Sequence, residues 1–266
     1  MNIDNIKRDF GVAHYIRLAN LQARMKLKSQ SNKLTLSYLW WVLEPLLFVL
    51  MFYVVFEYLL KRGGEDYFSF LVIGKTVYLW FSKTIISASK GMIENKNIIS
   101  QRDIPKWIFP IVNILESYYK TSISFAVLFI MLWLNGFPPT VSYIHLIPLS
   151  LLMTLLICAL SFVGSLLVSF ARDFMNLIRI SMMGMMFMSG VFWDIKSIED
   201  EHTREILLLY NPLSMIIDAF RDVLMHQVEP SYMLMLPSLF ISCLLIGFSL
   251  WFISKYNNSI SRALFS

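Results

Sequence analysis

The chain has 266 residues, of which 57% are apolar and only 15% are Asp, Glu, Lys or Arg, whereas soluble domains carry roughly 25% charged residues. This composition, with a mean hydropathy of +0.60, excludes a large soluble catalytic domain and leaves room for about six membrane spans of roughly 20 residues each. The net charge of +5 does not indicate a nucleic-acid-binding face, because the basic residues lie mainly in short segments between apolar runs.

The N-terminal segment, residues 1–33, is polar and basic, and no apolar core precedes Leu34. We therefore expect no cleavable signal peptide. Six apolar runs follow, and we predict that each forms a membrane-spanning helix within one transmembrane domain, residues 34–266. The predicted spans are residues 36–60, 67–89, 108–134, 143–170, 174–193 and 232–254. The sequence thus predicts an all-α integral membrane protein with six spans.

The connection between the second and third spans, residues 94–106, mixes apolar and polar side chains. Ile98, Ile99 and Arg102 have the spacing of neighbours on one helix. Two interpretations are open: a short amphipathic helix on the membrane surface, or a helix that docks into a cytosolic partner. We favour docking.

The segment between the fifth and sixth spans, residues 195–231, is apolar in part but broken. Pro212 removes a helical hydrogen bond and disfavours helix at Asn211. We therefore expect two short helices that dip partway into the membrane rather than a seventh span. Such irregular backbone is tolerated at membrane depth only where protein or a water-filled cavity shields it.

Lys and Arg are unevenly distributed between the connections. They are concentrated in residues 1–33 and 90–106, at Arg172 and Arg179 and after residue 254, whereas residues 194–229 hold eight acidic residues. By the positive-inside rule, both termini are predicted to face the cytoplasm.

Several ionisable residues fall inside predicted spans, where they are costly and are functional candidates. Lys75 either serves a function or extends to the membrane interface, and the sequence leaves both open. Glu116 and Lys120 have the i, i+4 spacing of an intrahelical ion pair, which we favour over a transport role. Glu44 precedes Pro45, so we expect its carboxylate to face the bundle interior or an aqueous path.

Aromatic side chains are frequent in the first two spans and are not confined to the membrane interfaces. Much of this is explained by interfacial belts and packing. Flat aromatic faces also suit sugar rings, which stack without demanding one register, as bases do in single strands. The candidate substrate-channel residues are Tyr38, Trp40, Trp41, Glu44, Tyr53, Phe56, Lys75 and Tyr78.

Motifs for chemistry in this chain are lacking. The triplet at 74–76 superficially resembles the end of a phosphate-binding loop, but that motif needs glycine where Ser69 stands. The four histidines are scattered, and Cys158 and Cys243 lie inside apolar runs. We therefore expect no catalytic residue, no metal site, no disulfide and no cofactor in this chain.

Three segments together carry a family resemblance. Residues 36–45, residues 170–174 and residues 210–213, the last followed by Arg221, resemble membrane subunits of ABC-2 type bacterial polysaccharide exporters. These are the permeases of O-antigen and capsule export. The order and spacing of the segments, with six spans, cover essentially the whole chain.

The resemblance implies a half-transporter in the bacterial inner membrane. Two copies would form the pore, and two separate ATPase subunits would bind ATP and Mg beneath them. The N-terminal segment would lie along the cytoplasmic surface, where Lys and Arg attract anionic lipid headgroups or a lipid pyrophosphate. The residues implied in ATPase coupling are Asn95, Ile98, Ile99, Arg102 and Asp103. Those implied at a periplasmic re-entrant exit are Tyr210, Asn211, Pro212 and Arg221.

The implied cargo is a polysaccharide on an undecaprenyl-type lipid, with O-antigen as first choice. Capsule or teichoic acid export remains an alternative within the family. An integral membrane glycosyl- or acyltransferase and a passive channel are alternatives from other classes. A transferase should show paired acids or a His and Asp arrangement at one membrane face, and residues 199–201 are the nearest candidate.

Overall fold

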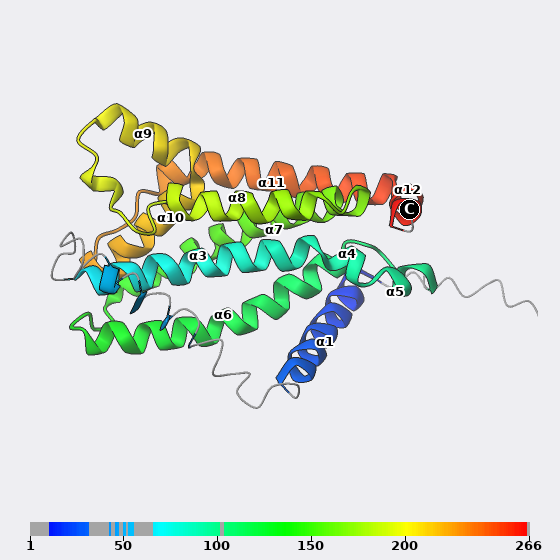
Figure 1. Ribbon diagram of the computed structural model, residues 1–266, viewed down its shortest axis with the longest axis horizontal. Coiled ribbons are helices and arrows are strands. Elements are labelled where there is room, and N and C mark those ends of the chain that lie inside the picture. The colour runs from blue at the N-terminus through cyan, green and yellow to red at the C-terminus, as the bar shows by residue number, and fades with distance from the viewer. Residues whose placement is uncertain are drawn as a thin grey trace, which may run out of the picture.

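The computed structural model describes residues 11–31, 66–101 and 104–264, together with scattered positions between 43 and 55. Within these residues all regular structure is helical, which confirms the predicted all-α class (Figure 1). Most of the predicted first span lies outside the described residues. The candidate site residues that lie outside them are Tyr38, Trp40, Trp41, Glu44, Phe56, Arg102 and Asp103.

The described α-helices and the short helical turns between them follow one another along the chain. The α-helices are α1 (Val12–Ser31), α3 (Tyr67–Ser89), α4 (Gly91–Glu94), α5 (Lys96–Gln101), α6 (Ile108–Leu134), α7 (Leu146–Phe170), α8 (Phe174–Met188), α9 (Glu201–Tyr210), α10 (Pro212–Arg221), α11 (Tyr232–Lys255) and α12 (Asn257–Ala263). The turns are η3 (Val141–His145), η4 (Ile195–Ser197) and η5 (Asp222–His226).

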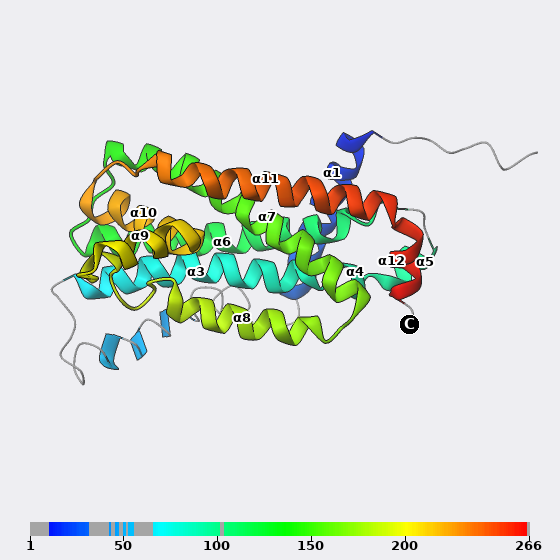
Figure 2. The same cartoon turned by 90° about the horizontal axis from the view of Figure 1, so that it is seen from above.

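Four stretches are long and apolar enough to cross a membrane, namely α3, α6, η3 with α7, and α11. Helix α8 is apolar but shorter. These helices run side by side along the long axis of the molecule (Figures 1 and 2). The chain is therefore a multi-pass membrane protein, and the count of six spans stays a prediction.

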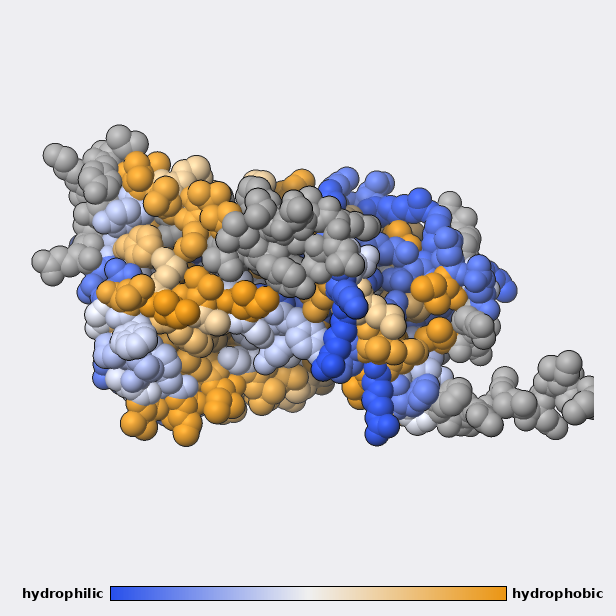
Figure 3. All heavy atoms as spheres, turned by 90° about the horizontal axis from the view of Figure 1, so that it is seen from below, coloured by the Kyte–Doolittle hydropathy of each residue, from blue (hydrophilic) through white to orange (hydrophobic). Residues whose placement is uncertain are grey.

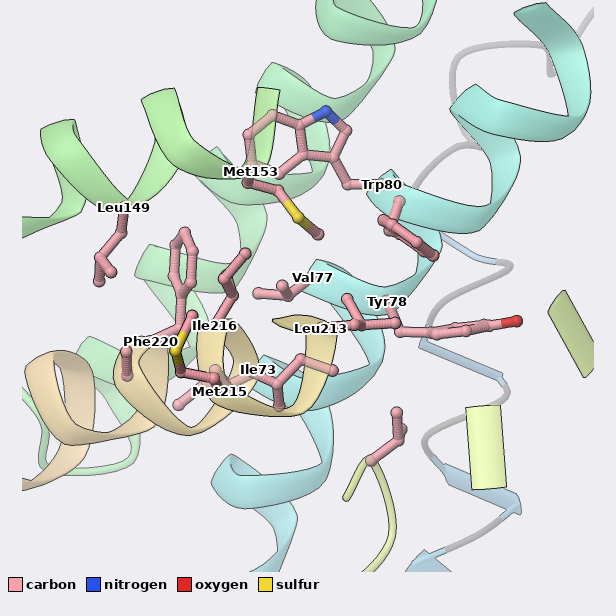
Figure 4. Close-up of a cluster of buried hydrophobic side chains, with 14 of the residues drawn as sticks. Ile73, Val77, Tyr78, Trp80, Leu149, Met153, Leu213, Met215, Ile216 and Phe220 are labelled. Carbon is pink, nitrogen blue, oxygen red and sulfur yellow. The ribbon is translucent and has the colours of Figure 1, made fainter. Parts of the chain in front are cut away.

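Helix α3 is the central element, because it packs against α6, α7, α8 and α10. The cluster where α3, α7 and α10 meet is apolar and tightly enclosed (Figure 4). Its labelled members are Ile73, Val77, Tyr78 and Trp80 from α3, Leu149 and Met153 from α7, and Leu213, Met215, Ile216 and Phe220 from α10. Burial of these side chains fixes the short helix α10 to the long bundle.

The remaining short helices gather at two opposite ends of the bundle. Helices α9 and α10 lie at one end, and α4, α5 and α12 lie at the other, where the chain also ends (Figure 1). The structure thus separates the segment predicted to contact an ATPase from the segment predicted to border the pore exit.

Helix α8 ends at Met188, before the predicted end of the fifth span at residue 193. Gly190 has φ of +67°, a left-handed conformation that glycine adopts without steric cost. The indole of Trp193 donates a 2.8 Å hydrogen bond to the carbonyl of Phe187. The apolar residues after Met188 therefore form a buried turn rather than a continuation of the helix. The apolarity of the sequence does not distinguish these two structures.

Helix α1 packs against the first half of α6. Ala19 and Ala23 are fully buried against Ile108 and Val112. Small side chains four residues apart form a narrow face on α1, which allows close approach of the two helices. The N-terminal segment thus contains a helix docked on the bundle.

Large hydrophobic side chains remain exposed along the long helices, including Ile180 and Phe187 of α8 and Met233, Phe240 and Leu244 of α11. On the face that carries α6 and α1, hydrophobic surface is extensive and hydrophilic surface gathers toward the end with α1 (Figure 3). Soluble monomers rarely expose contiguous apolar patches of this kind. Lipid contact explains them.

Candidate functional site

Arg221, the last residue of α10, is only 2% exposed. Its guanidinium donates hydrogen bonds to the carbonyls of Gly190 at 2.7 Å, Val191 at 3.0 Å and Phe70 at 3.2 Å. Its Cζ also lies 3.3 Å from the ring centroid of Phe70. Burial lowers the pKa of Arg221 to about 9, while Asp218 and Asp194 oppose the shift. The side chain therefore stays charged at neutral pH and joins α10, α3 and the turn after α8.

Gly74 of α3 provides the space for this guanidinium. A Cβ built at Gly74 would overlap Nη2 of Arg221 and would lie 3.1 Å from its Cζ and 3.2 Å from the Val191 carbonyl oxygen. The glycine is thus required by the close approach of a charged side chain, and we call these contacts the Arg221 junction.

Asn211 starts α10 and ties it to the end of α8. Its Oδ1 accepts a 3.2 Å hydrogen bond from the amide of Ser214, which caps the helix. Its Nδ2 donates to Oγ of Ser189 at 3.1 Å and to the Met188 carbonyl at 3.3 Å. Pro212 occupies the first turn, where a missing N–H costs nothing. The structure therefore has two short helices, α9 and α10, that meet at the predicted break.

Asn211→Ala is expected to lower the free energy of unfolding by about 1–2 kcal/mol, because it removes an N-cap acceptor and the bonds to Ser189 and Met188. The midpoint of thermal unfolding in detergent measures this. Asn211→Asp keeps the capping oxygen and should fall between the wild type and the alanine variant. An alanine variant as stable as the wild type would contradict the capping role.

The four residues implied at a re-entrant exit differ in their surroundings. Asn211 and Arg221 both contact the turn between Met188 and Val191, whereas Tyr210 is 78% exposed. The structure thus brings Asn211 and Arg221 to the same turn and leaves the side chain of Tyr210 exposed.

An ionic cluster lies beside the Arg221 junction. Lys196 forms an ion pair with Asp222 and lies 3.8 Å from Asp218. Burial alone would lower the pKa of Lys196, but its carboxylate neighbours raise it. Burial raises the pKa of Asp218 to about 6; Asp222 and Asp194 add to the shift, and Lys196 and Arg221 oppose it.

The raised pKa of Asp218 makes stability depend on pH. The folded protein binds this proton more tightly than the unfolded chain, so the stabilisation is complete below about pH 4 and is lost as pH rises through about 6. Thermal unfolding of the wild type should thus shift to lower temperature between pH 5 and 7.5 by more than that of Asp218→Asn. Glu205→Gln, at an exposed acid of α9, is the control and should keep the wild-type shift.

Lys75 and Tyr78 face α8 from within α3. Lys75 is 4% exposed, and its Nζ lies 3.3 Å from Sδ of Met186 and 5.3 Å from the ring centroid of Tyr78. The Tyr78 hydroxyl donates to a main-chain carbonyl of α8 at 2.6 Å. This burial does not fit extension of Lys75 to the interface. Tyr53 packs by its ring against the first turn of α3.

At the opposite end, α4 and α5 break at Asn95, whose Nδ2 donates to the Gly91 carbonyl at 2.8 Å. Ile99 is buried in a cluster with Met92, whereas Ile98 is 40% exposed. The two isoleucines therefore point in different directions, although the spacing favoured one shared surface. Of the two, Ile98 is accessible to a partner.

Polar contacts join four helices at this end. Lys26 of α1 donates to Oδ1 of Asn113 in α6 at 2.8 Å and lies 3.8 Å from a carboxylate oxygen of Glu94 in α4. Lys106 is buried and donates to Asn257 of α12, both at its side chain, at 2.5 Å, and at its carbonyl. We call these contacts the basal clamp.

Comparison with known proteins decides the family. A sequence model of the family described as ABC-2 type transporter matches residues 21–225. The chain belongs to the ABC-2 type transporter family.

Three relatives illustrate the similarity. The ABC-2 chain is 24% identical over 223 residues to an O-antigen export system permease protein RfbA of Klebsiella pneumoniae, covering 84% of this chain and 85% of the relative. It is 19% identical to the RfbA of Myxococcus xanthus over 77% and 79% of the two chains. It is 24% identical to the polysialic acid transport protein KpsM of Escherichia coli over 75% and 78%.

Some residues that organise this ABC-2 chain were not found from its sequence. Gly74 allows the close approach of Arg221, and Gly91 allows that of the backbone at Phe109. The sequence around Gly74 is apolar and that around Gly91 is polar, and neither pattern indicates these contacts. Ala19 and Ala23 do give a sequence signal, since two alanines four residues apart in a basic segment can form a helix-packing face.

The ion pair predicted between Glu116 and Lys120 is confirmed, at 2.5 Å.

Among the described residues, no group of three His, Cys, Asp or Glu side chains could hold a metal ion. The described residues form packed helices with the buried charges Arg221, Lys75 and Lys106. The short helices lie at two opposite ends of the bundle. The ABC-2 family implies an ATP-binding partner subunit in an ABC transporter.

Proposed function

We propose that this chain is the membrane subunit of an ATP-driven exporter of a lipid-linked polysaccharide, with O-antigen as first choice. Two copies form the channel, and two ATPase subunits bind on the cytoplasmic side. The observation that carries the proposal is similarity over 84% of the chain to a protein named as an O-antigen export permease. Capsule export is the alternative within the family, because a relative is named for polysialic acid transport.

The separation of the two bundle ends supports this assignment. Helices α4 and α5 are short, and Ile98 is exposed beside Asn95. In this proposal an ATPase binds at α4 and α5, with Arg102 and Asp103 in the same segment. The basal clamp then links α4 to α6, because Lys26 contacts both Glu94 of α4 and Asn113 of α6. Movement of α4 is thereby transmitted to a long helix. Both termini lie on this cytoplasmic side of the bacterial inner membrane.

Helices α9 and α10 form the periplasmic re-entrant region in this proposal. The Arg221 junction joins the first turn of α3, at the Phe70 carbonyl, to the irregular backbone after α8. Protein thus shields the polar groups that membrane depth would otherwise leave unsatisfied. In the same scheme the sugar path is lined by aromatic residues of the first span, including Tyr53, whereas Tyr78 lies buried against α8.

The rival classes have less support. A glycosyl- or acyltransferase needs a catalytic constellation. Asp200, the middle residue of the nearest acidic candidate, instead caps α9 through Thr203. A passive channel needs no ATPase, whereas the ABC-2 family supplies membrane subunits of ABC transporters.

The test is co-purification with the ATPase subunit that this proposal requires, followed by hydrolysis assays in lipid with and without lipid-linked polysaccharide. We expect a stable complex whose hydrolysis responds to the polymer. Purification of this chain alone, with ATPase absent after mild solubilisation, would contradict the half-transporter and favour the transferase or channel.

A further inference from the structure

A groove lies between α1, α7 and α11, at the end of the bundle where α12 starts (Figure 1). Its volume is about 760 Å³. The walls are mainly apolar and include Val12 and Ile16 from α1, Leu155 and Phe162 from α7, and Ile246, Leu250 and Ile253 from α11. Pockets of roughly 300–1,000 Å³ with mainly apolar linings are typical of ligand sites.

Two apolar side chains of α1 line this groove and remain exposed. Val12 is 64% exposed and Ile16, one turn later, is 49% exposed. By contrast, Ala19 and Ala23 on the same helix are fully buried against α6. Removal of apolar surface from water is favourable, so an apolar ligand in the groove stabilises the start of α1 against the bundle.

The depth of the groove matches one leaflet of a membrane. On α11 its lining runs from Ile246 to Ser254, which at 1.5 Å per residue is about 12 Å. Half of a hydrocarbon core of roughly 30 Å is about 15 Å. Leu244 and Phe248 of α11 are exposed and belong to the surface that contacts lipid. The groove therefore borders lipid, and an acyl chain can enter it from the side.

Aromatic and polar groups mark one end of the groove. Tyr15 and Trp107 line it and pack edge to face, with 6.2 Å between their ring centroids. Tyr and Trp are enriched at the headgroup level of membranes. The exposed Ser254 also lines the groove. Lys106 lines it as well, but its ammonium is bonded to Asn257 and is not needed for a ligand.

Two exposed cations stand next to the lining in sequence. Arg17 follows Ile16 on α1, and Lys255 follows Ser254 at the end of α11. The ammonium of Lys255 lies 4.7 Å from the ring centroid of Trp251. Within the described residues the lining contains no carboxylate. Basic pockets between membrane helices favour anionic lipid headgroups.

We propose that this groove, the α1–α11 groove, binds one anionic phospholipid of the surrounding bilayer. An acyl chain lies between α7 and α11 and covers Val12 and Ile16, while the phosphate lies at the end marked by Trp107 and Ser254. The basic composition of residues 1–33 predicts only attraction to a membrane surface, whereas the groove defines a single bound lipid. This site rests on the chain lying in a membrane and does not depend on the proposed export function or its substrate.

Native mass spectrometry of the purified protein in detergent tests the site by titration with phosphatidylglycerol or phosphatidylcholine. We expect the first phosphatidylglycerol to bind about tenfold more tightly than phosphatidylcholine, as hydrogen bonds to charged groups provide. Arg17→Gln with Lys255→Gln should remove most of this preference. Arg179→Gln, at an exposed cation of α8, is the control and should keep it.

Matched variants on two helices test the path of the acyl chain. Leu155→Trp fills the groove from α7 and should weaken binding of the first phosphatidylglycerol severalfold, whereas Leu151→Trp, at an exposed site of the same helix, should not. Ile16→Gln makes the α1 wall polar at an exposed position that folding tolerates, and it should also weaken binding. Leu21→Gln, at a similarly exposed position of α1 outside the lining, is its control.

Three results would overturn the site. Equal affinity of the wild type, Leu155→Trp and Ile16→Gln would show that the lipid binds elsewhere. Graded binding of many phosphatidylglycerol molecules, without a tighter first one, would show annular lipid only. Displacement of phosphatidylglycerol by an equal concentration of undecaprenyl phosphate would assign the groove to a carrier lipid. These measurements use neither ATPase nor polysaccharide, so failure of this site is distinguishable from failure of the proposed function.

Discussion

Gly74→Ala is expected to destabilise the protein by about 3–5 kcal/mol, the cost typical of breaking the interactions of a buried charge. The new methyl group occupies the position of Nη2 of Arg221, and the opposite wall is the Val191 carbonyl. The guanidinium cannot retreat into water because it is buried on all sides. Thermal unfolding in detergent and polysaccharide export in cells should both fall sharply.

Gly184→Ala is the matched control, because a Cβ at this α8 glycine meets nothing within 4 Å. It should be neutral or slightly stabilising, as alanine favours helix over glycine. A double-mutant cycle sharpens the test. Once Arg221→Met has removed the guanidinium, adding Gly74→Ala should cost much less than it does in the wild type. Additive effects of the two substitutions would show that the clash is not with Arg221.

Gly91→Ala should uncouple ATP hydrolysis from export while the ATPase still binds. A Cβ at Gly91 would lie 2.8 Å from the carbonyl oxygen of Phe109 and 3.0 Å from the nitrogen of Pro110. These are backbone atoms at the start of α6, so α4 must move instead. Overpacking of this kind costs typically 1–3 kcal/mol, and the displaced α4 no longer transmits movement to α6.

The measurement is the number of ATP molecules hydrolysed per polymer exported in proteoliposomes. We expect this ratio to rise severalfold in Gly91→Ala, with co-purification of the ATPase retained. Gly247→Ala, at a helical glycine of α11 with open space around it, serves as the comparison. An unchanged ratio in Gly91→Ala would remove α4 from the coupling path.

The class of fold was predictable because long apolar runs leave few alternatives to helices in a membrane. The break at Asn211 followed from the geometry of proline alone. The end of α8 did not, since residues 189–193 are as apolar as the helix before them. The left-handed Gly190 ends the helix locally, and Arg221, distant in sequence, holds the turn by taking the carbonyls of Gly190 and Val191.

The candidate site was predictable in its residue types more than in its geometry. Lys75 was marked by its cost in a membrane, but its enclosure against α8 depends on how the helices pack. Ile98 and Ile99 were grouped by spacing, yet adjacent helical residues point about 100° apart, and the bundle buries only Ile99.

The basal clamp changes how the C-terminus should be regarded. Lys106, two residues before α6 begins, donates a hydrogen bond to Asn257 of α12. The short helix α12 is therefore attached to the segment that leads into α6. In the proposed exporter, movement of α4 would reach α12 through α6 and the contact between Lys106 and Asn257. In the proposed exporter, a fluorophore attached beyond α12 would report movement of α4 during each cycle of ATP hydrolysis.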